Sequence, residues 1–130
     1  MNKSVLLLVV LAVPLLLIVQ VANAQQQNSP KATILDTKTL TIKNLKFVDE
    51  GLSYSITGTV INKSQREAVN VIVYAILYDA NNNIINVASA PSDVLSLKPG
   101  GDSAFKVPFS PAQHAREFPN HYSLVAGDND

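Results

Sequence analysis

The densest group of oxygen-bearing side chains lies near the middle of the chain, in the segment DANNN. Asp79, Asn81 and Asn83 occupy the first, third and fifth positions of this segment, as the ligands of an EF-hand loop do. Such a loop also needs glycine at its sixth position and a bidentate glutamate at its twelfth, where this chain has Ile84 and Ala90. Because Asn and Asp also favour tight turns, we expect a hairpin turn here rather than a calcium site.

The chain has two histidines, His114 and His121, and no cysteine. Zinc and copper sites usually take three or four ligands of suitable type. We therefore expect two solvent-facing histidines beside a short helix and no bound cofactor. A weak surface copper site, completed by Asp128 or Asp130, is a secondary hypothesis.

Catalytic patterns are missing from the sequence. There is no G-x-S-x-G motif, and only five glycines are present. Gly100 and Gly101 follow Pro99, which indicates a turn, and Asp49 and Glu50 precede a glycine in another expected turn. We expect a protein that is not an enzyme.

The charge balance argues against nucleic-acid binding. Lys and Arg number 10, Asp and Glu also number 10, and the formal net charge is zero. The longest basic group, Lys38, Lys43 and Lys46, is interrupted by uncharged residues, unlike the basic stripe of a nucleic-acid-binding protein.

Asn62-Lys63-Ser64 matches the acceptor sequence for N-glycosylation. It falls at a predicted turn between strands, where an acceptor would be accessible in an exported chain. Glycosylation of Asn62 is therefore a hypothesis.

The N-terminus has the three parts of a secretory signal peptide. Lys3 precedes an apolar run from Val5 to Val19, and Ala22-Asn23-Ala24 supplies small residues for cleavage after Ala24. The alternative is a retained anchor, since residues 5–22 as a helix would measure roughly 27 Å, close to the hydrocarbon thickness of a bilayer.

Both interpretations export the rest of the chain to the extracellular side or the cell surface. In the anchored form the N-terminus stays inside, and only residues 5–22 contact the membrane. The predicted organisation is a leader or anchor at 1–24, a polar linker at 25–31, a domain at 32–126 and a frayed acidic tail at 127–130.

The domain follows the period of two that is typical of β-strands with one buried face. Leu52, Tyr54, Ile56 and Val60 alternate with polar residues, and so do Phe105, Val107 and Phe109. Between Leu40 and Phe47 the phase changes near Lys43-Asn44, which predicts a bulge.

Turn-forming residues separate these segments at short intervals. About seven strands at this spacing predict an all-β fold, an antiparallel immunoglobulin-like β-sandwich behind an N-terminal hydrophobic helix. Ser110-Pro111 offers a helix N-cap, so we expect a short helix over residues 112–118 before the last strand, Tyr122 to Ala126.

The segment from Val69 to Tyr78 is apolar on both faces, which predicts a central strand. One of its faces is formed by Ile72, Tyr74, Ile76 and Tyr78. This face either lies within the sandwich or under a loop, or it is a docking surface for a partner, since tyrosines with aliphatic neighbours are common in interface cores.

Several of these motifs together resemble the FxLYD domain family, small exported immunoglobulin-like modules of archaea and bacteria. The resemblance spans roughly Leu40 to Val125. The residues that carry it are Gly58, Val60, Asn62, Ser64, Leu77-Tyr78-Asp79, Leu97, Pro99-Gly100 and Phe105. The phenylalanine of the family motif is Ala75 in this chain. The resemblance implies a fold and a cell-envelope location, and no catalytic activity.

Three functions remain open at this point. The first is a non-enzymatic, exported cell-envelope module that binds or scaffolds another envelope or membrane protein. The second is a membrane-anchored accessory subunit of a membrane protein complex. The third is an exported copper carrier that uses His114 and His121.

Overall fold

The part of the chain that the structure describes forms a two-layered, all-β fold. The structure, a computed structural model, describes residues 29–109 and 118–129. The seven strands are β1 (Lys31–Ile34), β2 (Leu40–Asp49), β3 (Tyr54–Asn62), β4 (Ile72–Tyr78), β5 (Ile84–Pro91), β6 (Asp102–Phe109) and β7 (His121–Gly127). The expected number of strands is confirmed.

Two predicted elements lie outside the described residues: the N-terminal hydrophobic helix, and residues 112–117 of the short helix before the last strand. Within the part of the chain that is described, no helix is long and apolar enough to cross a membrane.

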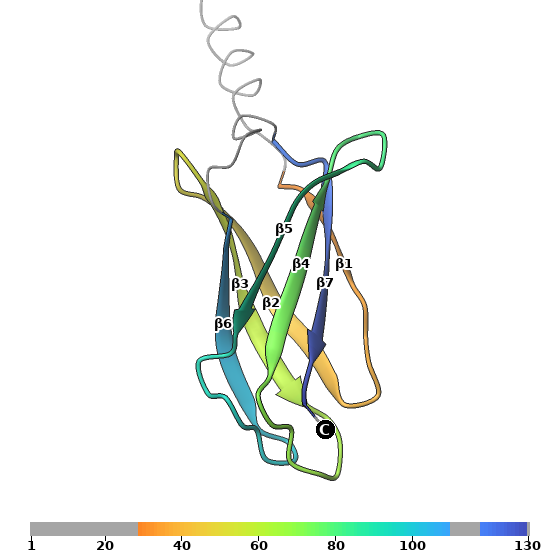
Figure 1. Ribbon diagram of the computed structural model, residues 1–130, viewed down its shortest axis with the longest axis vertical. Coiled ribbons are helices and arrows are strands. Elements are labelled where there is room, and N and C mark those ends of the chain that lie inside the picture. Colours follow the sequence, from red (N-terminus) through yellow and green to blue (C-terminus); the bar gives the residue numbers. More distant parts are fainter. Residues whose placement is uncertain (1–28, 110–117, 130) are drawn as a thin grey trace, which may run out of the picture.

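The strands form a four-stranded sheet, in the order β1-β7-β4-β5, and a three-stranded sheet, in the order β2-β3-β6. Figure 1 shows β4 and β7 in front of the fainter β2 and β3. The sequence predicted purely antiparallel sheets, and this prediction is wrong for one pair of strands. Strand β1 runs parallel to β7, with Lys31 opposite His121 and Ile34 opposite Leu124. Because these strands are distant in sequence, no hairpin restricts them to antiparallel pairing.

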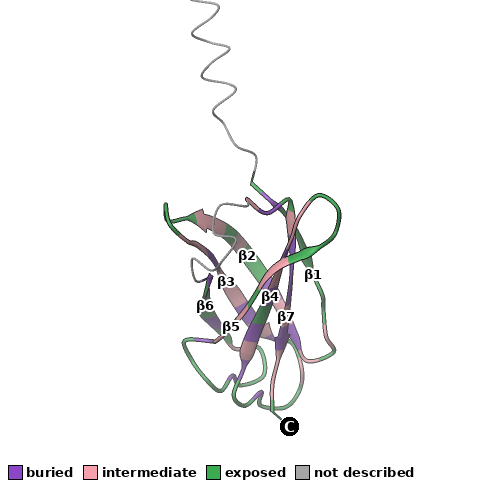
Figure 2. Cartoon of the chain, turned by 45° about the horizontal axis from the view of Figure 1, so that its top comes forward, coloured by how far each residue is buried: buried purple, intermediate pink, exposed green. Residues whose placement is uncertain are grey.

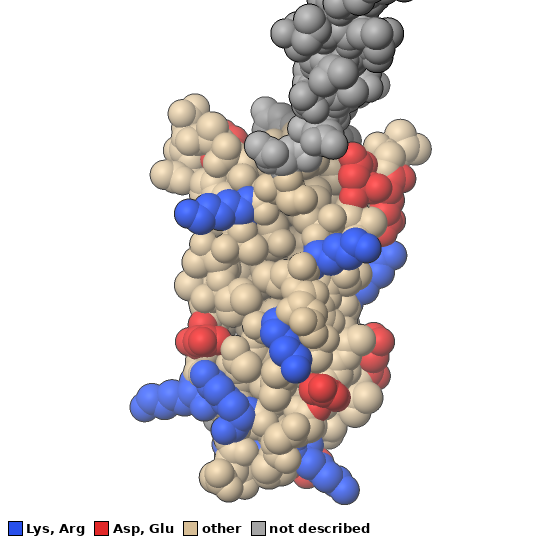
Figure 3. Space-filling model, turned by 180° about the vertical axis from the view of Figure 1, so that it is seen from behind, with Lys and Arg blue, Asp and Glu red and all other residues tan. Residues whose placement is uncertain are grey.

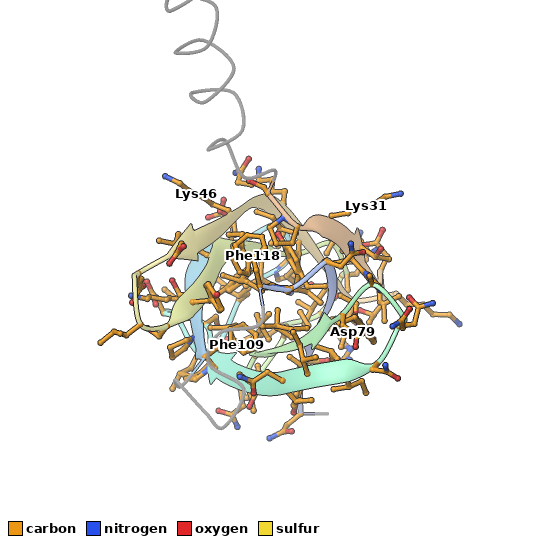
Figure 4. The ribbon with its side chains drawn as sticks, turned by 90° about the horizontal axis from the view of Figure 1, so that it is seen from above. Lys31, Lys46, Asp79, Phe109 and Phe118 are labelled. Carbon is orange, nitrogen blue, oxygen red and sulfur yellow. The ribbon has the colours of Figure 1, made fainter. Side chains whose placement is uncertain are left out.

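The space between the sheets is filled by side chains that alternate along each strand. On β6, Phe105, Val107 and Phe109 are at most 2% exposed, as their spacing predicted. Figure 4 looks down the long axis and shows side chains filling this layer, with Phe118 among them. The ring of Phe118 packs 5.7 Å from that of Phe47 and 5.8 Å from that of Tyr54, centroid to centroid. The two layers thus bury one apolar face of each sheet.

The predicted bulge in β2 is confirmed. The pairing of β2 with β3 shifts register between Lys43 and Lys46, and Asn44 has a φ of 57°. The extra residue reverses the alternation of the strand, so that Leu45 and Phe47 pack against the same core as Leu40.

The ends of the domain are longer than the sequence suggested. Pro30 is buried and Lys31 begins β1, so the last two residues of the expected linker belong to the fold. At the other end, Gly127 closes β7, and the backbone N–H of Asn129 donates to the carbonyl of Val69 at 2.9 Å. Residues 127–129 are therefore part of the domain rather than a frayed tail.

Two other boundaries were also predicted wrongly. Leu52 lies at the tip between β2 and β3 and is 85% exposed, although its spacing placed it on a buried face. Strand β4 begins at Ile72, whereas Val69 is outside the strand and 39% exposed. Turn geometry therefore overrides the local pattern at both positions, since apolar spacing alone does not fix where pairing starts.

Candidate functional site: the outer face of the four-stranded sheet

Strand β4 is a central strand, as predicted, between β7 and β5. Its buried residues, Val73, Ala75 and Leu77, are at most 2% exposed and face the other sheet. The alternate residues therefore point away from the core. The interpretation that Ile72, Tyr74, Ile76 and Tyr78 lie within the sandwich is wrong, because they form the outer surface of the sheet.

The neighbouring strands extend this surface. Residues directly opposite each other on paired strands share a face. The pairing sets Val87 and Ser123 on either side of Ile76, and Ser89 and Val125 on either side of Tyr74. We call the following set the β4 face: Ile72, Tyr74, Ile76, Tyr78, Val87, Ser89, Ser123 and Val125.

The β4 face is open to solvent within the described part of the chain. Tyr74 is 44% exposed and Val87 59% exposed, and Ser89 is exposed as well. Ile72, Ile76, Tyr78 and Val125 are partly buried, and Ser123 is buried. Figure 2 shows the exposed and intermediate residues of β4 and β5 on this side of the molecule. Contiguous exposed apolar surface of this kind is typical of interaction sites.

Formal charge is absent from the centre of this sheet. Strands β4, β5 and β7 contain no Lys, Arg, Asp or Glu, and β1 contributes only Lys31 at one end. A partner at this face would therefore displace water from apolar side chains without having to desolvate an ion.

The free edge of β5 does not favour addition of another strand. The backbone N–H of Val87 donates to Oδ1 of Asn86 at 2.9 Å, and Pro91 has no N–H to donate. The N–H of Ser92 donates to the carbonyl of Val71 at 3.0 Å, and this bond sets the alternation of the ladder. The backbone groups of Val87, Ser89 and Pro91 therefore point to the edge. Edge donors occupied in this way are a common protection against unwanted strand pairing.

An aromatic pair closes one end of the β4 face. The rings of Tyr78 and His121 stack with centroids 4.8 Å apart and an angle of 10° between their planes. The hydroxyl of Tyr78 also lies 3.1 Å from Oγ of Ser123, and Nδ1 of His121 lies 3.1 Å from Oδ1 of Asn120. These contacts fix the orientation of Tyr78 at the rim of the face.

The turn predicted at residues 79–83 is confirmed, and it joins β4 to β5. Oδ1 of Asp79 accepts hydrogen bonds from the backbone N–H groups of Asn81 and Asn83, each at 2.9 Å. Oδ2 accepts from Nδ2 of Asn83 at 3.1 Å. Hydrogen bonds from the backbone and side chain of Asn83 hold the pKa of Asp79 below its ordinary value. The carboxylate therefore serves as the internal acceptor that shapes an Asx turn.

The sequence predicted a turn at the sequon of Asn62. In the structure Asn62 is instead the last residue of β3, and it is fully buried. Its Nδ2 donates to the carbonyls of Arg66 at 2.7 Å and Leu97 at 2.8 Å, while Oδ1 accepts from Ser64. A glycan attached to Nδ2 would displace both bonds and require space that the core does not offer. The burial of Asn62 thus argues against its glycosylation in the folded domain.

The remaining predicted residues are separated or lie outside the described residues. Ala24, with its cleavage site, and His114 are among the residues that the structure does not describe. His121 begins β7 and stacks on Tyr78, and Asp128 lies 3.5 Å from Arg66 in an ion pair. Among the described residues, no three His, Asp or Glu side chains gather as metal ligands would. The copper hypothesis has no geometric support in these ranges.

Sequence reasoning missed the contributions of β5 and β7 to the β4 face. Val87 alternates with Asn86 and Ala88, a pattern that indicates a strand but does not show which strand it pairs with. Val125 and Ser123 lie beside β4 only through the register of β7. Their membership depends on long-range pairing, which a local pattern does not specify.

No family model matches the chain, and no curated protein matches it significantly. A DUF1425 family member from Shewanella sp. pv-4, solved by crystallography, aligns with a TM-score of 0.45 and 15% identity. That alignment covers 74% of this chain and 87% of the other. The Campylobacter jejuni protein cj0090 aligns with a TM-score of 0.41 and 14% identity, over 79% of this chain and 100% of that one. The resemblance to the FxLYD family stays a prediction.

Proposed function

We propose that this chain is a non-enzymatic, exported cell-envelope module, which binds or scaffolds another envelope protein through the β4 face. The observation that carries the proposal is an uncharged, tyrosine-bearing sheet surface that is open to solvent. Tyrosine and aliphatic side chains at the centre of a patch, with charged groups kept to its rim, are the composition of protein interfaces.

The immunoglobulin-like classification and the FxLYD assignment belong to this proposal. Two packed sheets of seven strands and the Leu77-Tyr78-Asp79 motif support them. In this proposal the motif has a structural role. Leu77 is buried in the core, Tyr78 turns outward to the end of the β4 face, and Asp79 shapes the following turn.

Export rests on the leader sequence, and the leader also separates two forms of the function. If residues 1–24 are removed, the module is released or held by its partner; if they remain, it is an anchored accessory subunit. The apolar run from Val5 to Val19 supports either form. The intact mass of the protein isolated from its native membranes distinguishes them, because a mature start at Gln25 contradicts the anchored form.

The binding proposal is tested with a matched pair of lysine substitutions on the two central strands. Ile76→Lys places a charge in the middle of the β4 face, and Thr59→Lys places one on the outer face of β3. Full-length protein is purified from its native cells in mild detergent, and co-purifying proteins are quantified. We expect Ile76→Lys to lower the recovery of a specific partner at least tenfold and Thr59→Lys to leave it unchanged. Equal recovery with both variants would contradict the proposal.

A further inference from the structure

We propose that the β4 face also binds a second copy of this chain, face to face about a two-fold axis, in a weak dimer that competes with the envelope partner. This inference rests on the proposed function in using the same face. The inference adds that a second copy of the chain is one of the molecules that bind this face. The charge, the side-chain sizes and the edges of the sheet support it.

The charge distribution suits a contact between identical surfaces. A two-fold contact sets the same patch on both copies, so any charge within the patch lies near its own counterpart and is repelled. Strands β4, β5 and β7 carry no charged side chain, and Lys31 lies at one end of the sheet. The whole chain has a formal net charge of zero, which removes long-range repulsion between copies.

The sizes of the side chains also suit a second sheet. Large residues follow one another along β4, while the positions beside them include Ser89 on β5 and Gly127 on β7. The ring of Tyr74 leans over Gly127, where an added Cβ would lie 3.8 Å from Cε2 of the tyrosine. If the two copies are offset by one strand, the large side chains along β4 of one copy lie against the small residues of the other. The two sheets would then pack face to face about 10 Å apart, as stacked sheets do.

The edges of the sheet favour a contact through the face over strand addition. The edge N–H of Val87 is occupied by Asn86, and Pro91 lacks an N–H. The opposite edge, β1, is only four residues long. A short or blocked edge offers few backbone partners, so two copies gain more by burying the apolar face.

The available area makes the dimer weak. Strands β4 and β7 have seven residues each and β5 has eight. At about 3.3 Å per residue and 4.8 Å between strands, they give a footprint of roughly 23 by 14 Å. That footprint is well below the ~800 Å² per partner of a stable complex. We therefore expect a transient dimer that a larger envelope partner displaces.

The absence of cysteine from the chain allows a direct test. Ser89→Cys and Val87→Cys place single thiols on the β4 face, and Ala104→Cys places a matched thiol on the exposed side of β6 in the other sheet. Full-length variants in mild detergent are treated with a short bis-maleimide, and covalent dimer is quantified on denaturing gels.

At least one thiol on the β4 face should give five times more dimer than Ala104→Cys. Adding Ile76→Lys to the same chain should reduce that yield to the level of Ala104→Cys. Yields that are equal for all three positions, or unaffected by Ile76→Lys, would overturn the dimer. If the dimer fails while the envelope partner is still lost from Ile76→Lys, the proposed function stands and only the second occupant is wrong.

Discussion

Strands β3 and β4 occupy the same place in their sheets, since each is flanked on both sides, and yet their outer faces differ in chemistry. The outer face of β3 is Thr57, Thr59 and Ile61, and at its end lies the buried Ser55, whose hydroxyl donates to the carboxylate of Glu50 at 2.7 Å. The corresponding face of β4 is Ile72, Tyr74, Ile76 and Tyr78. Hydroxyl side chains suit a strand that faces water, whereas tyrosine and isoleucine suit a surface that becomes covered.

The neighbours of each strand strengthen the contrast. Thr57 lies between Lys46 on β2 and Lys106 on β6, and Figure 3 shows blue and red side chains across this side of the molecule. Ile76 instead lies between Val87 and Ser123. The inner faces of both strands are fixed by the shared core, so the outer faces are where the two sheets are free to differ. The outer face of the three-stranded sheet therefore suits contact with water, whereas that of the four-stranded sheet is the candidate binding surface.

The largest expected effect comes from a polar residue on the inner face of β3. Asn62→Asp replaces the amide donor to the carbonyls of Arg66 and Leu97 with a buried carboxylate. We expect a loss of about 3 kcal/mol in the free energy of unfolding, because two buried acceptors lose their donor. Urea denaturation monitored by circular dichroism measures this loss. Asn70→Asp, at an exposed asparagine, is the control and should change stability little; a similar loss in both would contradict a special role for Asn62.

The next effect tests the close packing inside β3. A Cβ at Gly58 would lie 2.8 Å from Cζ of Phe105 and 3.1 Å from the carbonyl oxygen of Lys43. Gly58→Ala should therefore lower the free energy of unfolding by about 2 kcal/mol, since the buried ring has to move. A double-mutant cycle with Phe105→Leu should recover part of the cost, because the shorter side chain leaves room. Additive losses in the cycle would show that the ring is not the cause.

A smaller effect tests whether the β4 face is open in the monomer. Tyr74→Thr keeps a side chain that suits a strand and removes the ring, which is 44% exposed. We expect the free energy of unfolding to change by less than about 1 kcal/mol, as at other surface positions. The reciprocal variant, Thr59→Tyr, is compared in the same urea titration. A loss above about 2 kcal/mol for Tyr74→Thr would mean that the face is covered within one chain, and the contrast between the sheets would fail.

The smallest effect is electrostatic and concerns the hairpins of the two sheets. Hydrogen bonds from Asn83 lower the pKa of Asp79 in the β4–β5 turn. Glu50, between β2 and β3, also has a lowered pKa. The larger cause is a hydrogen bond from the hydroxyl of Ser55, and the next is a hydrogen bond from Lys106. A carboxyl group with a lowered pKa stabilises the fold above its ordinary pKa, which is about 3.9 for Asp and 4.3 for Glu, and that contribution is lost as the pH falls through the folded value.

Asp79→Asn should accordingly lower the melting temperature at neutral pH by a few degrees at most, and the difference from the wild type should shrink in acid. Glu50→Gln should also lower the melting temperature at neutral pH, and this difference should shrink in acid. It should shrink with added salt as well, because the ion pair of Glu50 with Lys106, at 3.0 Å, is screened. Melting curves recorded between about pH 7 and pH 2 measure both differences. A difference that grows in acid would reverse the sign and contradict the assigned contacts.

Much of the fold was predictable because its signals are local. The alternation of Phe105, Val107 and Phe109, the turn at residues 79–83 and the change of phase at Lys43-Asn44 each depend on neighbours within a few residues. The candidate site was only half predictable. The four outward residues of β4 follow from the period of two, but that period does not distinguish a buried second face from an exposed one.

The sequence by itself determined most of the strands and their inner faces, the leader motif and the lack of cysteine. Only the tertiary structure decided that β1 lies parallel to β7, that Asn62 is buried and that the second face of β4 is open to solvent. These properties depend on which strands pair, and in what register, between residues far apart in the chain. Local spacing sets which side of a strand a residue occupies, whereas long-range pairing sets what that side meets.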